Sequence, residues 1–190
     1  MTRFFTRIAA ASLMALVSTA AFAAEPENTL VISLKDGDVT IALRPDLAPK
    51  HVEQIKALTR KGAYDNVVFH RVIDGFMAQT GDVQFGNSAK DFNPAQAGMG
   101  GSDLPDIKAE FSQEPFVRGT VGMARAQSPD SANSQFFITF GDASFLNGQY
   151  TVVGNVESGM ELVDKIKKGD EAQNGVVSDP DKMVKVKIAA

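Results

Sequence analysis

An arginine and a glutamine, Arg71 and Gln79, lie in a stretch that is otherwise apolar enough for a protein core, FHRVIDGFMAQTGD. The Asp-Gly pair in its middle readily supplies the positive φ of a tight turn, so the stretch predicts a hairpin of two short strands. On the first strand, alternation places Arg71 on the same face as Phe69 and places His70 on the opposite face. On the second strand, Gln79 shares a face with Met77. Such donors in an apolar setting can hydrogen-bond a ligand, but a cation on a strand more commonly belongs to a structural ion pair. The hairpin alone leaves both interpretations open.

A second stretch repeats the combination of an amide and large apolar side chains. It begins with GMARA at residues 122–126, passes through a polar turn and continues as SQFFIT at 134–139. Alternation places Gln135 on one face with Phe137 and Thr139. Two such strands in one small chain predict an apolar groove that carries a few hydrogen-bonding groups.

The N-terminus has the layout of a secretory signal peptide. Arg3 and Arg7 precede the uncharged apolar run 8–20, and Ala-Phe-Ala at 21–23 is a small-x-small cleavage site. The run is shorter than the about 20 apolar residues that span a bilayer. We therefore expect residues 1–23 to be a signal peptide cleaved after Ala23, residues 24–190 to form one domain, and the product to be periplasmic or secreted, with no membrane association.

Composition excludes several classes of function. The mature chain would have 17 basic and 23 acidic residues, a net charge of −6, which argues against nucleic-acid binding. There is no cysteine, and the two histidines fit no hydrolase or metalloprotease motif, so we expect no disulfide, metal or cofactor. Carboxylates such as Asp82 and Glu110 are expected to be mostly solvated. The glycines at 98–101 lack a phosphate-binding motif, and 85–115 is predicted to be a long surface loop.

The remaining pattern predicts a mostly β protein. Strands are expected at 29–34, 39–43, 120–124, 135–140, 150–156 and 184–188, in addition to the hairpin. Helical spacing predicts one helix at 49–61, and the capping-box pair Ser158 and Glu161 predicts a second at 158–168. Two helices among about eight short strands indicate an antiparallel sheet or a closed barrel with helices over its ends.

From about residue 30 to 188, the sequence resembles the cyclophilin family of peptidyl-prolyl cis-trans isomerases, in particular its bacterial periplasmic members. The resemblance rests on three blocks, FHRVIDGFMAQTGD at 69–82, QFFI at 135–138 and FLNGQYTVVG at 145–154. It implies a closed eight-stranded antiparallel β-barrel capped by two α-helices, with the active groove on its outer surface. It also implies that the domain at 24–190 isomerises X-Pro peptide bonds.

The resemblance also assigns roles to individual residues. Arg71 matches the catalytic arginine, and Gln79 matches the glutamine that orients the substrate. The implied substrate-binding residues are Phe76, Met77, Ala124, Arg125, Ala126, Gln135, Phe137, Phe145, Leu146 and Tyr150. Three of these depart from the best-studied members, which have Asn in place of Arg125, Trp in place of Phe145 and His in place of Tyr150.

The chemistry of such an enzyme suits these residue types. Rotation about an X-Pro bond has a barrier of about 18–20 kcal/mol because amide resonance must be broken. A donor near the proline nitrogen stabilises the twisted bond, so no nucleophile, metal or cofactor is required. The expected partners are proline-containing, unfolded or partly folded polypeptides, and the expected state is a monomer. A peptide-binding module or holdase that uses the same groove without turnover remains the alternative.

Overall fold

The computed structural model describes residues 25–90 and 92–189, so the predicted signal peptide lies outside the described residues. The strands are β1 (Thr29–Leu34), β2 (Gly37–Leu43), β3 (Arg71–Ile73), β4 (Met77–Thr80), β5 (Thr120–Met123), β6 (Phe136–Thr139), β7 (Val152–Ser158) and β8 (Lys185–Ile188). They form one antiparallel sheet in the order β3-β4-β6-β5-β7-β2-β1-β8. The mostly β prediction and the strand positions are confirmed to within two residues or so at most ends.

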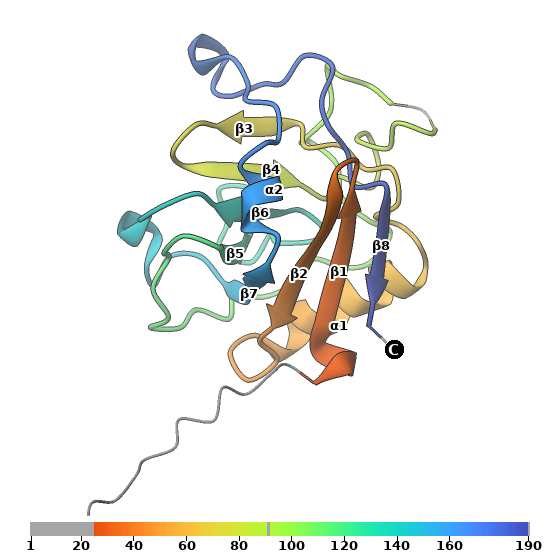
Figure 1. Ribbon diagram of the computed structural model, residues 1–190. Helices are drawn as coiled ribbons and strands as arrows, with labels where there is room; N and C mark the ends of the chain where they lie inside the picture. Colours follow the sequence, from red (N-terminus) through yellow and green to blue (C-terminus); the bar gives the residue numbers. More distant parts are fainter. Residues whose placement is uncertain (1–24, 91, 190) are drawn as a thin grey trace, which may run out of the picture.

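The sheet curls but does not close, so the prediction of a closed barrel was wrong (Figure 1). The edge strands β3 and β8 share no ladder. The segments next to them meet at an isolated bridge between Val68 and Lys182 and at single backbone hydrogen bonds, such as Asn66 N–H to Met183 O at 2.7 Å. The outer edge of β3 is occupied instead by residues 169–177, because Val72 N–H donates to Gly175 O at 2.8 Å. The backbone N–H and C=O groups on the outer edge of β3 are therefore satisfied without pairing to β8.

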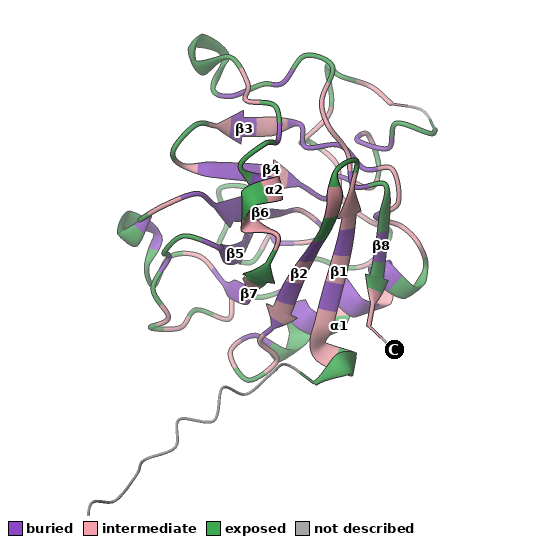
Figure 2. Cartoon of the chain, in the orientation of Figure 1, coloured by how far each residue is buried: buried purple, intermediate pink, exposed green. Residues whose placement is uncertain are grey.

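The central strands are buried on both faces (Figure 2). Every residue of β5 and β6 is buried, because alternate side chains enter two separate apolar clusters. Ile138 packs into the main core beneath the curl, and Phe137 packs into a smaller cluster on the outer face. Phe69 also enters the main core, so it does not share a face with Arg71 as predicted, because β3 begins only at Arg71 and alternation does not extend back to Phe69.

The described residues form two α-helices beside the sheet, and only the first is as long as predicted. α1 (Pro49–Arg60) has proline in its first turn and buries Val52, Ile55 and Leu58 against the main core. α2 is a single turn, Met160–Val163, and the capping box does not form: Ser158 ends β7, and the N-cap is Gly159 with φ 83°. No helix within the described part of the chain is long and apolar enough to cross a membrane.

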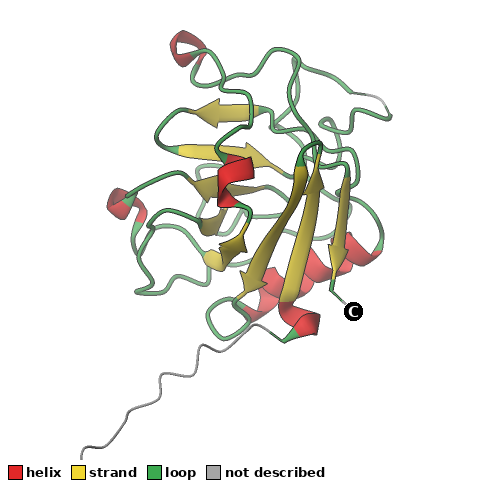
Figure 3. Ribbon diagram, viewed as in Figure 1, coloured by secondary structure: helices red, strands yellow, loops and turns green. Residues whose placement is uncertain are grey.

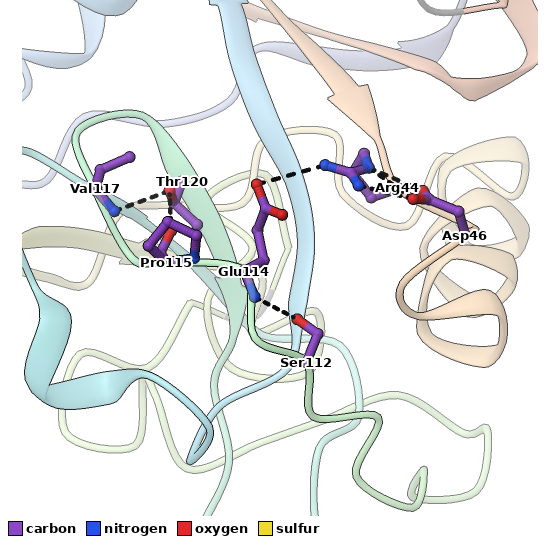
Figure 4. A network of polar contacts seen from close by, with 7 residues as sticks. All are labelled: Arg44, Asp46, Ser112, Glu114, Pro115, Val117 and Thr120. Carbon is purple, nitrogen blue, oxygen red and sulfur yellow. Dashed lines mark hydrogen bonds and ion pairs between the residues drawn. The ribbon is translucent and has the colours of Figure 1, made fainter.

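The long loop predicted at 85–115 is confirmed, since none of its described residues, 85–90 and 92–115, belongs to a helix or a strand (Figure 3). Its C-terminal end is tied to β5, where Thr120 Oγ1 accepts from Val117 N–H at 3.1 Å and donates to Pro115 O at 3.3 Å (Figure 4). Arg44 pairs with Glu114 at 3.6 Å on the other side of this turn. These contacts hold the intervening Phe116, which is fully buried in the outer cluster.

Candidate active site

The outer apolar cluster forms the floor of a surface cavity of about 300 Å³. Phe137 is at its centre, with its ring stacked on Phe116 at 5.8 Å and edge-on to Tyr150 at 5.8 Å. Alternation along β4 and β6 carries Met77 and Phe137 to this face, while Ala78 and Ile138 enter the main core. The same register brings Gln79 to the rim of the cavity.

The structure brings together nearly all of the site residues expected from the sequence. The cavity is lined by Arg71, Phe76, Met77, Gln79, Ala124, Arg125, Phe137, Phe145, Leu146 and Tyr150. The other two, Ala126 and Gln135, line a neighbouring cavity of about 550 Å³, which shares Gln79, Ala124 and Arg125 with the first. The two cavities therefore form one continuous groove.

Arg71 is a partly buried cation whose hydrogen-bond partners in the described part of the chain are all neutral. Its Nη1 donates to Gln79 Oε1 at 3.2 Å, its Nε to Asn174 O at 2.9 Å and its Nη2 to Asn174 Oδ1 at 2.9 Å. Within the described residues no carboxylate forms an ion pair with it. Partial burial lowers the pKa of Arg71, although a guanidinium stays charged. The structural ion pair that the sequence left open is thus ruled out.

A chain of amides sets the orientation of Gln79. Gln135 Nε2 donates to two backbone carbonyls, Gly98 O at 2.9 Å and Gly100 O at 2.8 Å, so its Oε1 must face the other way. That Oε1 accepts from Gln79 Nε2 at 3.0 Å, which turns Gln79 Oε1 towards Arg71. The two carbonyls therefore determine which end of each amide faces which partner.

Asp82 lies behind residues 98–101, the glycine loop, and is fully buried. The prediction that this carboxylate is mostly solvated was wrong. Its Oδ1 accepts from the N–H groups of Gln84 at 3.0 Å and Phe85 at 2.9 Å, and its Oδ2 accepts from Gly98 at 2.7 Å and Gly100 at 3.0 Å. A carboxylate can be buried when hydrogen bonds replace its hydration. Asp82 thus organises the loop that holds Gln135.

Glu110 also has fixed partners, at the N-terminus of α1. It accepts from the N–H groups of Lys50 and His51 and from His51 Nδ1 at 2.6 Å. Burial acts to raise the pKa of the Glu110 carboxyl, but these hydrogen bonds hold it below its usual value. The prediction that it is solvated was wrong, because free N–H groups at a helix N-terminus attract a carboxylate.

The three departures from the best-studied members, Arg125, Phe145 and Tyr150, all line the cavity. The Arg125 guanidinium lies 4.4 Å from the centre of the Tyr150 ring and donates to Ala126 O, Gln127 O and Gln149 O. Its side chain lines both cavities, and these hydrogen bonds hold it in place. Phe145 is 63% exposed and contacts Phe76, with ring centroids 5.3 Å apart.

His70 is buried beneath the groove and does not line the cavity. This agrees with the prediction that it lies on the strand face opposite to Arg71. Among the described residues, neither ring nitrogen has a partner in hydrogen-bonding geometry. Burial lowers the pKa of His70 to about 4, against a weaker opposing attraction from Asp82. The imidazole is therefore neutral at neutral pH and takes no part in proton transfer there. No group of metal-binding side chains occurs among the described residues.

We expect His70 to make the protein acid-sensitive. Its unfolded pKa is near 6.5 and its folded pKa is about 4, so the unfolded state binds the extra proton between these values. The free energy of unfolding should therefore be highest above about pH 6.5 and should fall by about 3 kcal/mol as the pH is lowered to 4. Urea unfolding across pH 4–8 measures this. His70→Gln should flatten that decline and keep most activity; an equally steep decline in the variant would contradict the assignment.

The sequence did not reveal Asn174, Phe116 or the carbonyls of the glycine loop as parts of this site. The Asn-Gly pair at 174–175 was a usable turn signal, but its link to Arg71 spans 103 positions. The backbone carbonyls have no sequence signal of their own.

The fold and the site together define a prolyl isomerase of the cyclophilin type. A family model described as cyclophilin-type peptidyl-prolyl cis-trans isomerase matches residues 29–188. The chain therefore belongs to this family of enzymes.

Named relatives agree with this family. The chain is 67% identical over 187 residues to a probable peptidyl-prolyl cis-trans isomerase of Brucella suis, covering 96% of this chain and 95% of the relative. It is 37% identical to peptidyl-prolyl cis-trans isomerase A of Dickeya dadantii, covering 84% and 83% of the two chains.

Solved structures show the same fold. The cyclophilin AquaCyp293 from Hirschia baltica matches with a TM-score of 0.72 and 25% identity, over 87% of this chain and 75% of that one. A Cryptosporidium parvum cyclophilin-type isomerase, crystallised in the presence of the dipeptide Ala-Pro, matches with a TM-score of 0.71 and 26% identity, over 85% and 99%.

Proposed function

We propose that this isomerase acts on X-Pro bonds of exported polypeptides, assists their folding and forms no covalent intermediate with them. The observation that carries the proposal is Arg71, a partly buried cation on the rim of an apolar cavity with only neutral partners. A cation held in this way is available to a ligand instead of being neutralised within the protein.

In the proposed mechanism Arg71 donates to the proline nitrogen as the bond twists. A guanidinium has five N–H groups, and three are used by Gln79 and Asn174, which leaves two for substrate. The nitrogen gains a usable lone pair only when amide resonance is lost, so this hydrogen bond is stronger in the transition state than in either planar form. One preorganised donor contributes roughly 2.7–4 kcal/mol.

The apolar floor is proposed to hold the proline ring. Met77, Phe137 and Leu146 line the same cavity as Arg71, so a ring seated on them displaces water from the vicinity of Arg71. Removing competing water strengthens the hydrogen bond to the twisting amide. Gln79 is proposed to orient the substrate, and Gln135, Ala124, Arg125 and Ala126 to contact the residues that precede proline.

We propose export because residues 1–23 resemble a signal peptide. Their removal would produce the mature domain 24–190, which is proposed to be a monomer in the periplasm or the medium. That form would have a net charge of −6 and no cysteine, so its folding needs no disulfide. Uncatalysed X-Pro isomerisation is slow enough to be a rate-limiting step in folding, and this is the step that such an enzyme would assist.

Fractionation of cells expressing the full chain tests this function. We expect the periplasmic or extracellular protein to begin at Ala24 and that fraction to accelerate isomerisation of a proline-containing peptide in a protease-coupled assay. The intact mass of the enzyme should be unchanged during turnover. Soluble exported protein with Met1 intact would contradict signal cleavage, and an enzyme–peptide adduct would contradict the non-covalent mechanism. Suppression of aggregation without turnover would favour a holdase.

A further inference from the structure

A short segment near the C-terminus lies along the outer edge of β3 and contacts the guanidinium of Arg71. Residues 169–177 run beside β3 at the edge of the sheet (Figure 1), where Gly169 N–H donates to Val72 O at 2.9 Å and Val72 N–H donates to Gly175 O at 2.8 Å. These hydrogen bonds fix the segment relative to the strand that carries Arg71.

Within this segment the backbone is built so that Asn174 faces Arg71. Asp170 accepts from Ala172 N–H at 2.9 Å and from Gln173 Nε2 at 2.8 Å, and its carbonyl accepts from Gly175 N–H at 2.8 Å. Asn174 has φ 55°, a left-handed conformation that is uncommon for residues other than glycine but that asparagine tolerates. An uncommon backbone conformation that is held by its surroundings often marks a functional position.

Asn174 accepts two hydrogen bonds from one edge of the guanidinium. Its backbone carbonyl accepts from Arg71 Nε, and its side-chain Oδ1 accepts from Arg71 Nη2. Gln79 holds Nη1 on the other side. Because both holders are neutral amides, the plane of the guanidinium is fixed while its charge is left for the substrate. A carboxylate in either place would form an ion pair and weaken that charge.

We propose that Asn174 is a positioning residue for isomerisation, which orders the long side chain of Arg71 before substrate binds. Misorientation of a donor is costly in catalysis, and an arginine side chain left free must lose rotamer freedom on the way to the transition state. The proposal rests on the proposed role of Arg71 as the donor. Asn174 itself need not touch the substrate, so its effect belongs in kcat and not in KM.

The test replaces Asn174 with glycine, which tolerates the same backbone conformation and removes only the side-chain contact. We expect kcat to fall about 10-fold and KM to stay within about 2-fold. Asn66→Gly is the matched control, because Asn66 also has a positive φ, 63°, and lies outside the groove. That control should keep its full kcat.

A double-mutant cycle shows whether the effect passes through Arg71. Lysine lacks the planar fork that Asn174 holds, so Asn174→Gly should have almost no further effect in an Arg71→Lys background. An unchanged kcat in the single variant, a change in KM alone, an equal loss in Asn66→Gly or an undiminished loss in the lysine background would each overturn the proposal. Full activity of Arg71→Lys alone would instead overturn the proposed role of Arg71.

Discussion

Replacing Arg71 with alanine should lower kcat/KM about 100- to 1,000-fold while the protein stays folded. The physical reason is that the alanine variant has no donor for the proline nitrogen of the twisted bond. The apolar floor and Gln79 remain, so peptide binding should persist and the loss should fall mainly on kcat. A protease-coupled assay with the wild type and the variant under the same conditions measures it.

Thermal or urea unfolding is the control for this variant. Because the described residues that hydrogen-bond to Arg71 are neutral, we expect its removal to change the free energy of unfolding by less than about 2 kcal/mol. Loss of half of a buried ion pair would instead cost about 3–5 kcal/mol. Arg71→Lys should restore little activity, since lysine keeps the charge but not the planar fork. Near-normal turnover by folded Arg71→Ala would remove Arg71 from the mechanism.

Replacing Asp82 with alanine should lower the free energy of unfolding by about 3–5 kcal/mol. The fully buried carboxylate accepts from four backbone N–H groups. Each hydrogen bond to a charged group contributes about 1.5–3 kcal/mol, and water that enters the space left by the carboxylate would replace part of the total. Urea unfolding measures the loss.

The matched control for that variant is Asp130→Ala. Asp130 also accepts from a backbone N–H, that of Ala109 at 2.9 Å, but it is exposed, so we expect a loss below about 1 kcal/mol. Hydrogen exchange at Gly98 and Gly100 should rise strongly in Asp82→Ala and not in the control. If the two variants are equally stable, Asp82 does not organise the glycine loop.

These two residues lie at different points of one hydrogen-bonded chain. It runs from Asp82 through the glycine loop to Gln135, then through Gln79 to Arg71. Only the first and last members carry charge, and the amides between them keep the anion away from the cation. The groove thereby combines a buried, stabilising carboxylate with a guanidinium that is not neutralised.

Local pattern in the sequence was sufficient for the elements whose residues interact with near neighbours. The hairpin that the Asp-Gly pair predicted is present as β3 and β4, and its register places Arg71 opposite Gln79. α1 follows the helical spacing of its apolar residues, and strand alternation correctly placed Met77 and Gln79 on the groove face. In each case the contacts that decide the structure lie within a few positions along the chain.

Tertiary structure decided the features that depend on segments far apart in the chain. The sheet stays open because the 169–177 segment takes the outer edge of β3, and Asp82 is buried because a loop about 16 positions later wraps over it. The hydrogen bond between Arg71 and Asn174 joins residues that are 103 positions apart in the sequence. Periodicity reports only which face of an element is apolar. Which distant backbone group meets that face follows from packing and from the need to pair every buried donor and acceptor, and neither is encoded in any local stretch.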